Sequence, residues 1–303
     1  MRHFLNLHGQ DRDTLLHLLR EAARLKAEHQ KGKRATTLKG KVVALVFEKP
    51  SLRTRVSFES ATAQLGGTSM FLPGGEIGLG QREPLCDFAR TMSEYVNALV
   101  LRVFKQATVE EVARYSAIPV INGLSDTSHP CQGLGDLLTI QELFGTVVGK
   151  TVTFVGDGNN VARSLAVGCG KVGAKFILTC PEGYGFDATF AERYRKHVGG
   201  PLPEEVRDPV AAVKTADVIY TDVWTSMGQE AERDERLNRF APYQLTPALI
   251  AKAPSHVKVL HCLPAHRGEE ISPEVIEGPA SVVFQQAGNR LHAQKAVLEW
   301  LLG

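Results

Sequence analysis

Two kinds of hydrophobic spacing alternate along the chain. Near the start, apolar residues recur every three or four positions, at Leu15, Leu16, Leu18, Leu19, Ala22, Ala23 and Leu25. This is the spacing of one face of an α-helix. The run 42–47 is instead continuously apolar and short, as in a buried strand. The chain therefore opens with a helix followed by a strand.

The alternation continues through the first half. Further strand candidates are the apolar runs 69–72, 98–103 and 119–121. We expect the helices between them to open at Arg53, at Pro84 and at a capping box over 108–111. A helix over 130–144 should end at Gly145. Alternating strands and helices of this kind predict a mostly parallel sheet.

The pattern then restarts. Strands are expected at 151–155, 176–179, 218–221, 257–261 and 282–284, and an apolar-periodic helix at 289–301 closes the chain. The predicted fold class is α/β, with two domains that are each a mostly parallel sheet flanked by helices, joined by connecting interdomain helices. We expect a first domain over 1–145, with the helix 289–303 packed back on it, and a second over 148–288.

Size and charge agree with a two-domain enzyme. A chain of 303 residues suits two domains of roughly 150 residues each, and the cleft that two domains form is a usual place for small-molecule chemistry. The 35 Lys and Arg residues nearly balance the 33 Asp and Glu residues. No basic field is left to hold a polyanion, so nucleic acid is not an expected partner.

Cysteine usage and hydropathy indicate the compartment. The five cysteines are Cys86, Cys131, Cys169, Cys180 and Cys262. An odd count without a C-x-x-C pair argues against a disulfide framework and against a thiolate zinc site. The N-terminus lacks the apolar core of a signal peptide, and no apolar stretch approaches membrane-spanning length. We expect a cytoplasmic protein that does not bind membranes.

A candidate anion site follows the first strand. The strand 42–47 leads into Ser51-Leu52-Arg53-Thr54-Arg55, where Ser51 can cap a helix whose first turn carries the hydroxyl and the guanidinium groups. Free backbone N–H groups, the positive end of the helix dipole and these side chains suit a phosphate. A capped surface helix with solvated arginines is the alternative.

A second helix start has the same construction. The strand 119–121 leads to His129-Pro130-Cys131-Gln132, and Pro130 is preset for a first helical turn. His129 and Gln132 would then project from this helix start. Arg102, in the strand 98–103, lies at the same edge of a parallel sheet, where ligands bind in such folds.

Together these two motifs resemble the carbamoyl phosphate motifs of the aspartate and ornithine transcarbamoylase family. The family usually has threonine where this chain has Leu52, which removes a hydroxyl but keeps the backbone N–H. The resemblance implies that the phosphate is held by Ser51, Leu52, Arg53, Thr54 and Arg102. It implies that the carbamoyl group is surrounded by Thr54, Arg102, His129 and Gln132. Arg102 and His129 would act catalytically by polarising the carbonyl oxygen, as acyl transfer requires.

The turn after the strand 151–155 allows two interpretations. Gly156-Asp157-Gly158 is half of a dinucleotide fingerprint, so a nicotinamide-dependent oxidoreductase is the out-of-family alternative. Val161 stands where the third glycine should be, and the next strand ends without the acidic residue that a ribose requires. The family resemblance instead implies that Asn160 contacts the amino-acid substrate.

Two later strand ends resemble the ornithine branch of the family. They are Asp222 with Ser226-Met227-Gly228, and His261-Cys262-Leu263-Pro264. Asp222 would hold the substrate ammonium, while Asn160, Ser226 and Met227 are candidates for its carboxylate. The side-chain amine, with a pKa of about 10.4, must lose a proton before it attacks. The resemblance makes Cys262 a catalytic candidate, and the acceptor is either its thiolate beside Asp222 or the departing phosphate.

Three further carbamoyl phosphate contacts come from the resemblance, besides Cys262 itself. The backbone carbonyl of Leu263 would hold the carbamoyl NH2, and Arg290 would reach the carbamoyl group. The glycine-rich loop 73–84, with Glu76, resembles the loop that enters a neighbouring subunit's site. The family therefore implies a homotrimer or a multiple of trimers.

The implied reaction is attack of the neutral side-chain amine of L-ornithine on carbamoyl phosphate, giving L-citrulline and phosphate in arginine metabolism. No metal and no organic cofactor is expected, because the arginines supply the positive charge that a metal would provide. Putrescine and N-acetylornithine remain the alternative amines within the family.

Overall fold

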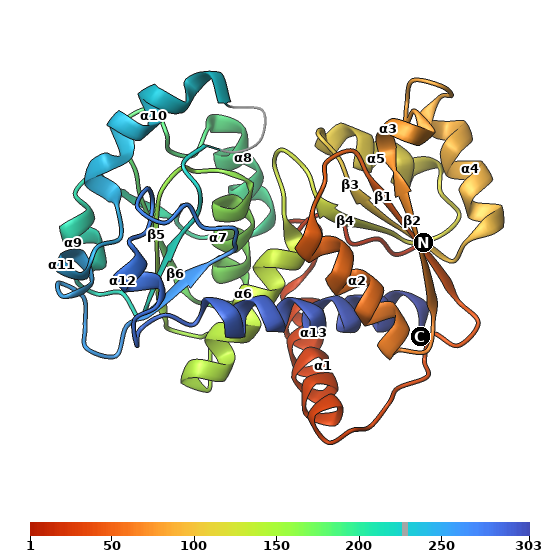
Figure 1. Cartoon of the computed structure of the whole chain (residues 1–303), viewed down its shortest axis with the longest axis horizontal. Coiled ribbons are helices and arrows are strands. Elements are labelled where there is room, and N and C mark those ends of the chain that lie inside the picture. Colours follow the sequence, from red (N-terminus) through yellow and green to blue (C-terminus); the bar gives the residue numbers. More distant parts are fainter. Residues whose placement is uncertain (226–229) are drawn as a thin grey trace. The chain divides into compact units, whose positions relative to one another are not determined.

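The computed structural model describes residues 1–225 and 230–303 of the chain (Figure 1). Two compact units are present, the first made of residues 1–138 and 289–303 and the second of residues 139–288. Each unit has its own sheet, of four and of five strands, and every strand pairing within them is parallel. The α/β fold with two parallel sheets flanked by helices is therefore confirmed.

The first unit is built on a sheet with the order β2-β1-β3-β4. Its strands are β1 (Val42–Phe47), β2 (Thr68–Pro73), β3 (Ala98–Arg102) and β4 (Val120–Leu124). Its helices are α1 (Arg12–Gln30), α2 (Leu52–Gln64), α3 (Gly74–Ile77), α4 (Leu85–Tyr95) and α5 (Gln106–Tyr115). The helix α6 (Pro130–Phe144) begins in this unit. Strands β1 and β3 are buried along almost their whole length, which explains their continuous apolar sequence.

The strand order places a ligand-binding edge in the first unit. The chain passes from β1 to β2 on one side of β1 and later adds β3 on the other side. Parallel sheets bind ligands beyond the carboxyl ends of strands at such a reversal. The register pairs Phe47 with Arg102, so the ends of β1 and β3 are adjacent. The start of α2 and Arg102 therefore lie at the reversal point.

The second unit repeats this arrangement. Its strands are β5 (Thr151–Val155), β6 (Lys175–Thr179), β7 (Glu204–Val206), β8 (Val218–Thr221) and β9 (Lys258–His261), in the order β7-β6-β5-β8-β9. Its helices are α7 (Asn160–Val172), α8 (Ala188–His197), α9 (Pro209–Val213), α10 (Arg233–Phe240), α11 (Pro247–Ile250) and α12 (Pro273–Ile276), with 3-10 turns η1 (Glu230–Glu232) and η2 (Ala241–Tyr243). The order reverses between β5 and β8, so the residues after these strands share one edge.

Two local predictions are wrong. The expected strand 282–284 does not form, because α13 (Val283–Leu302) begins there rather than at Asn289. A short apolar run does not distinguish a strand from a buried helical segment. The helix α5 begins at Gln106, with Lys105 as its N-cap, so the capping box over 108–111 lies inside the helix.

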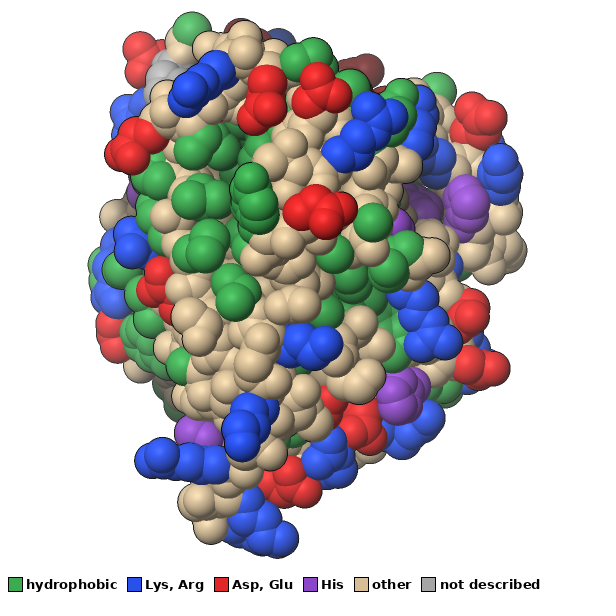
Figure 2. Space-filling model, turned by 90° about the vertical axis from the view of Figure 1, so that its right-hand side faces the viewer, with side chains coloured by type: hydrophobic (Ala, Val, Ile, Leu, Met, Phe, Trp, Pro, Cys, Tyr) green, Lys and Arg blue, Asp and Glu red, His purple; other side chains and the backbone are tan. Residues whose placement is uncertain are grey.

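Some large apolar side chains of the first unit remain exposed. Leu52 and Val56, one turn apart on α2, are 74% and 50% exposed, and Met70 on the edge strand β2 is 41% exposed. In the view of Figure 2, apolar side chains gather into a patch with charged side chains around it. None of the helices in the described residues combines the length and the apolar composition needed to cross a membrane.

Candidate active site

The start of α2 forms an anion site in the first unit. Ser51 is the N-cap in an extended conformation, and its Oγ accepts the backbone N–H of Thr54 at 3.4 Å. Arg55 stacks on the ring of Phe71 at 3.9 Å and pairs with Glu59, so it is engaged within the protein. Arg53 is half-buried and forms no hydrogen bond or ion pair to another described residue. Its guanidinium therefore remains for an anion.

Arg290 reaches this site from the other end of the chain. Its Nη2 donates to Oγ1 of Thr54 at 3.0 Å, and both side chains are buried. Arg290 packs closely against Gly135 of α6, because a Cβ at Gly135 would lie only 3.1 Å from the Arg290 Cγ and 3.3 Å from its Cα. The structure thus brings together two residues that the family resemblance placed on one ligand.

Arg102 and His129 are buried in the same unit, together with Gln132. Burial lowers the pKa of His129 well below its ordinary value, and the positive charges of Arg290 and Arg102 lower it further. The imidazole is therefore neutral at physiological pH and can offer one N–H to a carbonyl oxygen. Gln132 is oriented by Asp136, whose Oδ1 accepts its Nε2 at 2.8 Å.

The loop around Glu76 adopts a local structure that the sequence did not indicate. Residues Gly74–Ile77 form the short helix α3, where Glu76 is exposed. Among the described residues, no hydrogen bond or ion pair joins Glu76 to the anion site. Its contact with carbamoyl phosphate stays a prediction.

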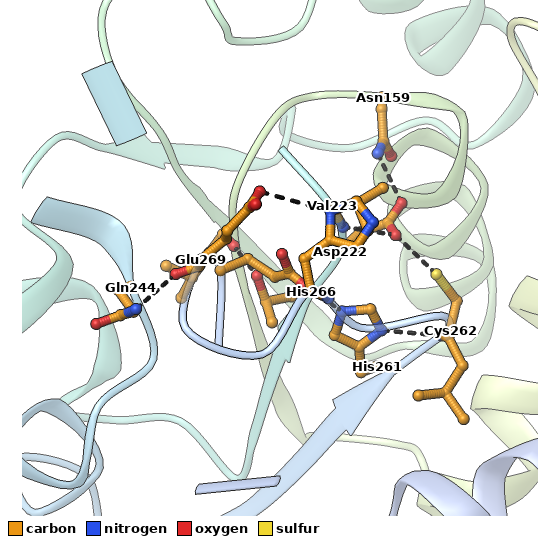
Figure 3. Close-up of polar contacts among 12 residues, drawn as sticks. Asn159, Asp222, Val223, Gln244, His261, Cys262, His266 and Glu269 are labelled. Atoms are coloured by element: carbon orange, nitrogen blue, oxygen red, sulfur yellow. Dashed lines mark hydrogen bonds and ion pairs between the residues drawn. The ribbon is translucent and has the colours of Figure 1, made fainter. Parts of the chain in front are cut away.

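Asp222 is the centre of the second unit's site. It follows β8, is buried, and accepts three hydrogen bonds (Figure 3). Its Oδ2 accepts Asn159 Nδ2 at 2.9 Å, and its Oδ1 accepts the Cys262 thiol at 2.9 Å and the Val223 N–H at 2.8 Å. The carboxylate is thereby fixed in one orientation at the reversal point of the sheet.

A buried His261–Glu270 pair supports the segment that carries Cys262. Nδ1 of His261 accepts the backbone N–H of Leu263 at 2.9 Å, so the ring proton lies on Nε2 and is donated to Glu270 Oε1 at 2.9 Å. The same carboxylate oxygen accepts the backbone N–H of His266 at 2.6 Å. The pair therefore closes the 261–266 segment into one fixed loop.

Leu263 has an unusual backbone within that loop. Its φ is +58°, a left-handed conformation that few residues other than glycine adopt, and a cis peptide bond joins it to Pro264. A left-handed φ at a residue other than glycine is held by surrounding contacts, and such residues cluster at functional sites. The residue with this backbone is the one whose carbonyl the family resemblance had singled out.

The donor sets near this loop do not favour a metal ion. Ligand atoms of Asp222, His261 and Cys262 lie within 4.8 Å of one another. Neither ring nitrogen of His261 offers a lone pair, because Nδ1 accepts from Leu263 and Nε2 carries the proton. In the second such group, which is His266, Glu269 and Glu270, the Glu269 carboxylate is paired with Arg233.

Sequence reasoning missed Asn159. Its Oδ1 caps α7 by accepting the N–H groups of Val161 and Ala162, at 2.9 and 3.0 Å, while its Nδ2 binds Asp222. An asparagine just before a helix is a recognisable N-cap signal, but its second bond depends on the strand order. The neighbouring Asn160 starts α7, and its contact with the amino acid stays a prediction. Ser226 and Met227 lie outside the described residues.

One glycine of the same turn, Gly158, packs closely against protein. Gly158 donates its N–H to the Tyr184 carbonyl at 2.9 Å, and a Cβ added there would lie 2.8 Å from the Gly185 carbonyl oxygen. Protein packing therefore explains this glycine without a dinucleotide.

Comparison with known proteins supports a single family over the whole chain. The carbamoyl-P binding domain of aspartate/ornithine carbamoyltransferase matches residues 2–142. The Asp/Orn binding domain of aspartate/ornithine carbamoyltransferase matches residues 148–301.

Individual relatives cover the chain from end to end. Ornithine carbamoyltransferase from Archaeoglobus fulgidus is 50% identical over 100% of this chain and 98% of its own length. The Bacillus subtilis protein of that name is 49% identical over 98% and 93%. The solved structure of ornithine carbamoyltransferase from Pyrococcus furiosus superimposes with a TM-score of 0.96 at 47% identity, covering 100% of this chain and 97% of that one. The chain therefore belongs to the aspartate/ornithine carbamoyltransferase family.

Proposed function

We propose that this protein transfers the carbamoyl group of carbamoyl phosphate to the side-chain amine of L-ornithine, giving L-citrulline and phosphate. The observation that carries the proposal is the contact of Asp222 with Cys262 and Asn159, since a fixed carboxylate suits an ammonium substrate. An aspartate substrate would require a cation at that place. The full-length similarity to proteins named ornithine carbamoyltransferase supports the same choice.

The first unit binds and activates carbamoyl phosphate. The phosphate rests on the N-terminus of α2, where Ser51, Arg53 and the free backbone N–H groups converge. The neutral His129 donates a hydrogen bond to the carbamoyl oxygen, and the charge of Arg102 stabilises the oxyanion that forms on attack. Arg290, held by Thr54, adds positive charge beside the same group.

The second unit binds the amine and accommodates its proton. Asp222 holds the substrate ammonium, because one carboxylate can accept from it as well as from its protein partners. The Cys262 thiol donates to Asp222, so the thiolate forms only if this proton moves onto the carboxylate. The amine proton then passes either to Cys262 with that shift or to the departing phosphate. Cys262→Ala distinguishes these routes. The variant should keep most of the turnover if the phosphate accepts the proton, and lose it if Cys262 does.

The assay follows ureido product from carbamoyl phosphate and ornithine, N-acetylornithine, putrescine or aspartate, each offered separately. Arg53→Ala is compared with Arg55→Ala, its neighbour on the same helix turn, whose guanidinium is already engaged with Phe71 and Glu59. We expect turnover of ornithine that Arg53→Ala abolishes and Arg55→Ala largely retains. If another amine is preferred, that amine replaces ornithine as the proposed substrate. Absence of turnover on every amine would refute the enzyme assignment.

The protein works as a homotrimer, or a multiple of one, in the cytoplasm. Exposed apolar side chains such as Leu52, Val56 and Met70 are typical of a surface that another subunit covers. No disulfide bond joins any of the five cysteines, all of which lie in the described part of the chain, and this suits a reducing compartment. Sedimentation velocity tests the assembly. Val56→Asp should shift the sedimentation coefficient towards that of a single chain, and an unchanged coefficient would contradict this interface.

A further inference from the structure

Arg236 is a buried arginine outside the set of residues assigned so far. It lies on α10, and only 7% of its side chain is exposed. A guanidinium is costly to remove from water unless its hydrogen bonds are satisfied in the protein. Its surroundings therefore explain why this position carries an arginine.

Three partners and an aromatic ring surround the guanidinium. Nη1 donates to Asp157 Oδ2 at 2.6 Å and to the backbone carbonyl of Trp224 at 3.0 Å. Nε donates to Glu232 Oε2 at 2.9 Å, and the ring centroid of Tyr184 lies 5.0 Å away. Arg236 thus joins α10 to the turn after β5 and to the segment after β8.

Both of these segments lead directly to the carboxylate at the amine site. Asp157 lies two residues before Asn159, which donates to Asp222. Trp224 lies two residues after Asp222. Arg236 therefore holds the chain on both sides of the Asn159–Asp222 hydrogen bond, and that bond in turn orients the carboxylate beside the Cys262 thiol.

We propose that Arg236 is a positioning residue for the amine substrate, acting through Asp157 and Trp224 to hold Asn159 and Asp222 in their binding arrangement. This inference rests on the proposed function, because it assigns the amine to Asp222. If this ion pair served stability alone, breaking it would leave the ratio of the KM values for the two substrates unchanged. A positioning residue affects the KM of the amine and leaves that of carbamoyl phosphate unchanged.

The test compares Arg236→Gln and Asp157→Asn with Arg239→Gln. Arg239 lies on the same helix and forms an exposed, long contact of 3.8 Å with Glu235, so it controls for charge loss on α10. We expect the KM for ornithine to rise roughly tenfold or more in the first two variants, as displaced contacts do at other sites. The KM for carbamoyl phosphate should stay within about twofold, and Arg239→Gln should match the wild type in both constants.

Two further variants make the result decisive. The double variant Asp157→Asn with Arg236→Gln should be no worse than the worse single variant, because both changes break one contact. Arg236→Lys, which keeps the charge and can retain one hydrogen bond, should recover part of the ornithine KM. If Arg236→Gln does not fold, Asp157→Asn alone carries the test, since it is nearly isosteric.

Equal rises in both KM values, or an unchanged KM for ornithine, would overturn the inference. The wild type is measured first with each amine, and the KM split is determined with whichever amine it accepts. A wild type that uses another amine thus refutes the proposed substrate while still testing Arg236. A wild type without any amine turnover overturns both proposals.

Discussion

Glu270→Ala tests whether the buried His261–Glu270 pair fixes the segment that carries Cys262. Both side chains of the pair are fully buried. The substitution leaves the Nε2–H of His261 without its acceptor, which costs roughly 1–3 kcal/mol. Loss of the half-buried bond from His266 N–H adds about 1 kcal/mol. We therefore expect the free energy of unfolding to fall by roughly 2–4 kcal/mol.

Two other variants bracket this value. Glu270→Gln keeps an oxygen in the accepting position, but it loses the charge assistance and places an NH2 group where Oε2 is buried without a partner, so its cost should be about 1–2 kcal/mol. Glu269→Ala, at the adjacent position, removes a partly exposed ion pair with Arg233 and should cost no more than about 1 kcal/mol. Urea unfolding at one fixed protein concentration, analysed by linear extrapolation, measures all three.

The relative losses in free energy of unfolding test the acceptor role of Glu270. If Glu270→Ala cost no more than Glu270→Gln, the acceptor role of this carboxylate would be refuted. Turnover gives a second readout, because the loop carries Cys262 and Leu263. We expect kcat to fall further in Glu270→Ala than in Glu270→Gln, and equal kcat values would contradict the positioning argument.

Three other predictions concern individual side chains. The folded pKa of His129 lies well below 6.5, so the unfolded chain binds more protons below pH 6.5 and the free energy of unfolding decreases as the pH is lowered. His129→Gln should remove up to about 1.4 kcal/mol per pH unit of this slope in urea titrations. Asp222→Asn should raise the KM for ornithine roughly 10- to 100-fold, since a charge-assisted bond is worth about 1.5–3 kcal/mol, and a change below threefold would count against an ammonium at Asp222. Leu52→Thr should leave the KM for carbamoyl phosphate within about threefold by steady-state kinetics, because the Leu52 side chain is 74% exposed and its backbone N–H is retained.

Local features were predictable because their causes lie within a few residues. The alternation of buried strands with helices indicated two parallel sheets, as the structure has them. Ser51 caps α2 through the N–H of Thr54, only three residues away. The same local signal did not separate a strand from a helix at 282–284, since three apolar residues fit either.

The sequence by itself determined the alternation of strands and helices, the capped helix start and the residue types available at each strand end. Only the tertiary structure decided which of these residues are in contact, because the hydrophobic pattern does not determine the order of the strands in a sheet. Arg290 contacts Thr54 across 236 positions, and Arg236 contacts Asp157 across 79. Asn159 reaches Asp222 because β5 and β8 are neighbours in the sheet. Such contacts depend on the packing of whole elements, so the arrangement of the site follows from the fold rather than from any one motif.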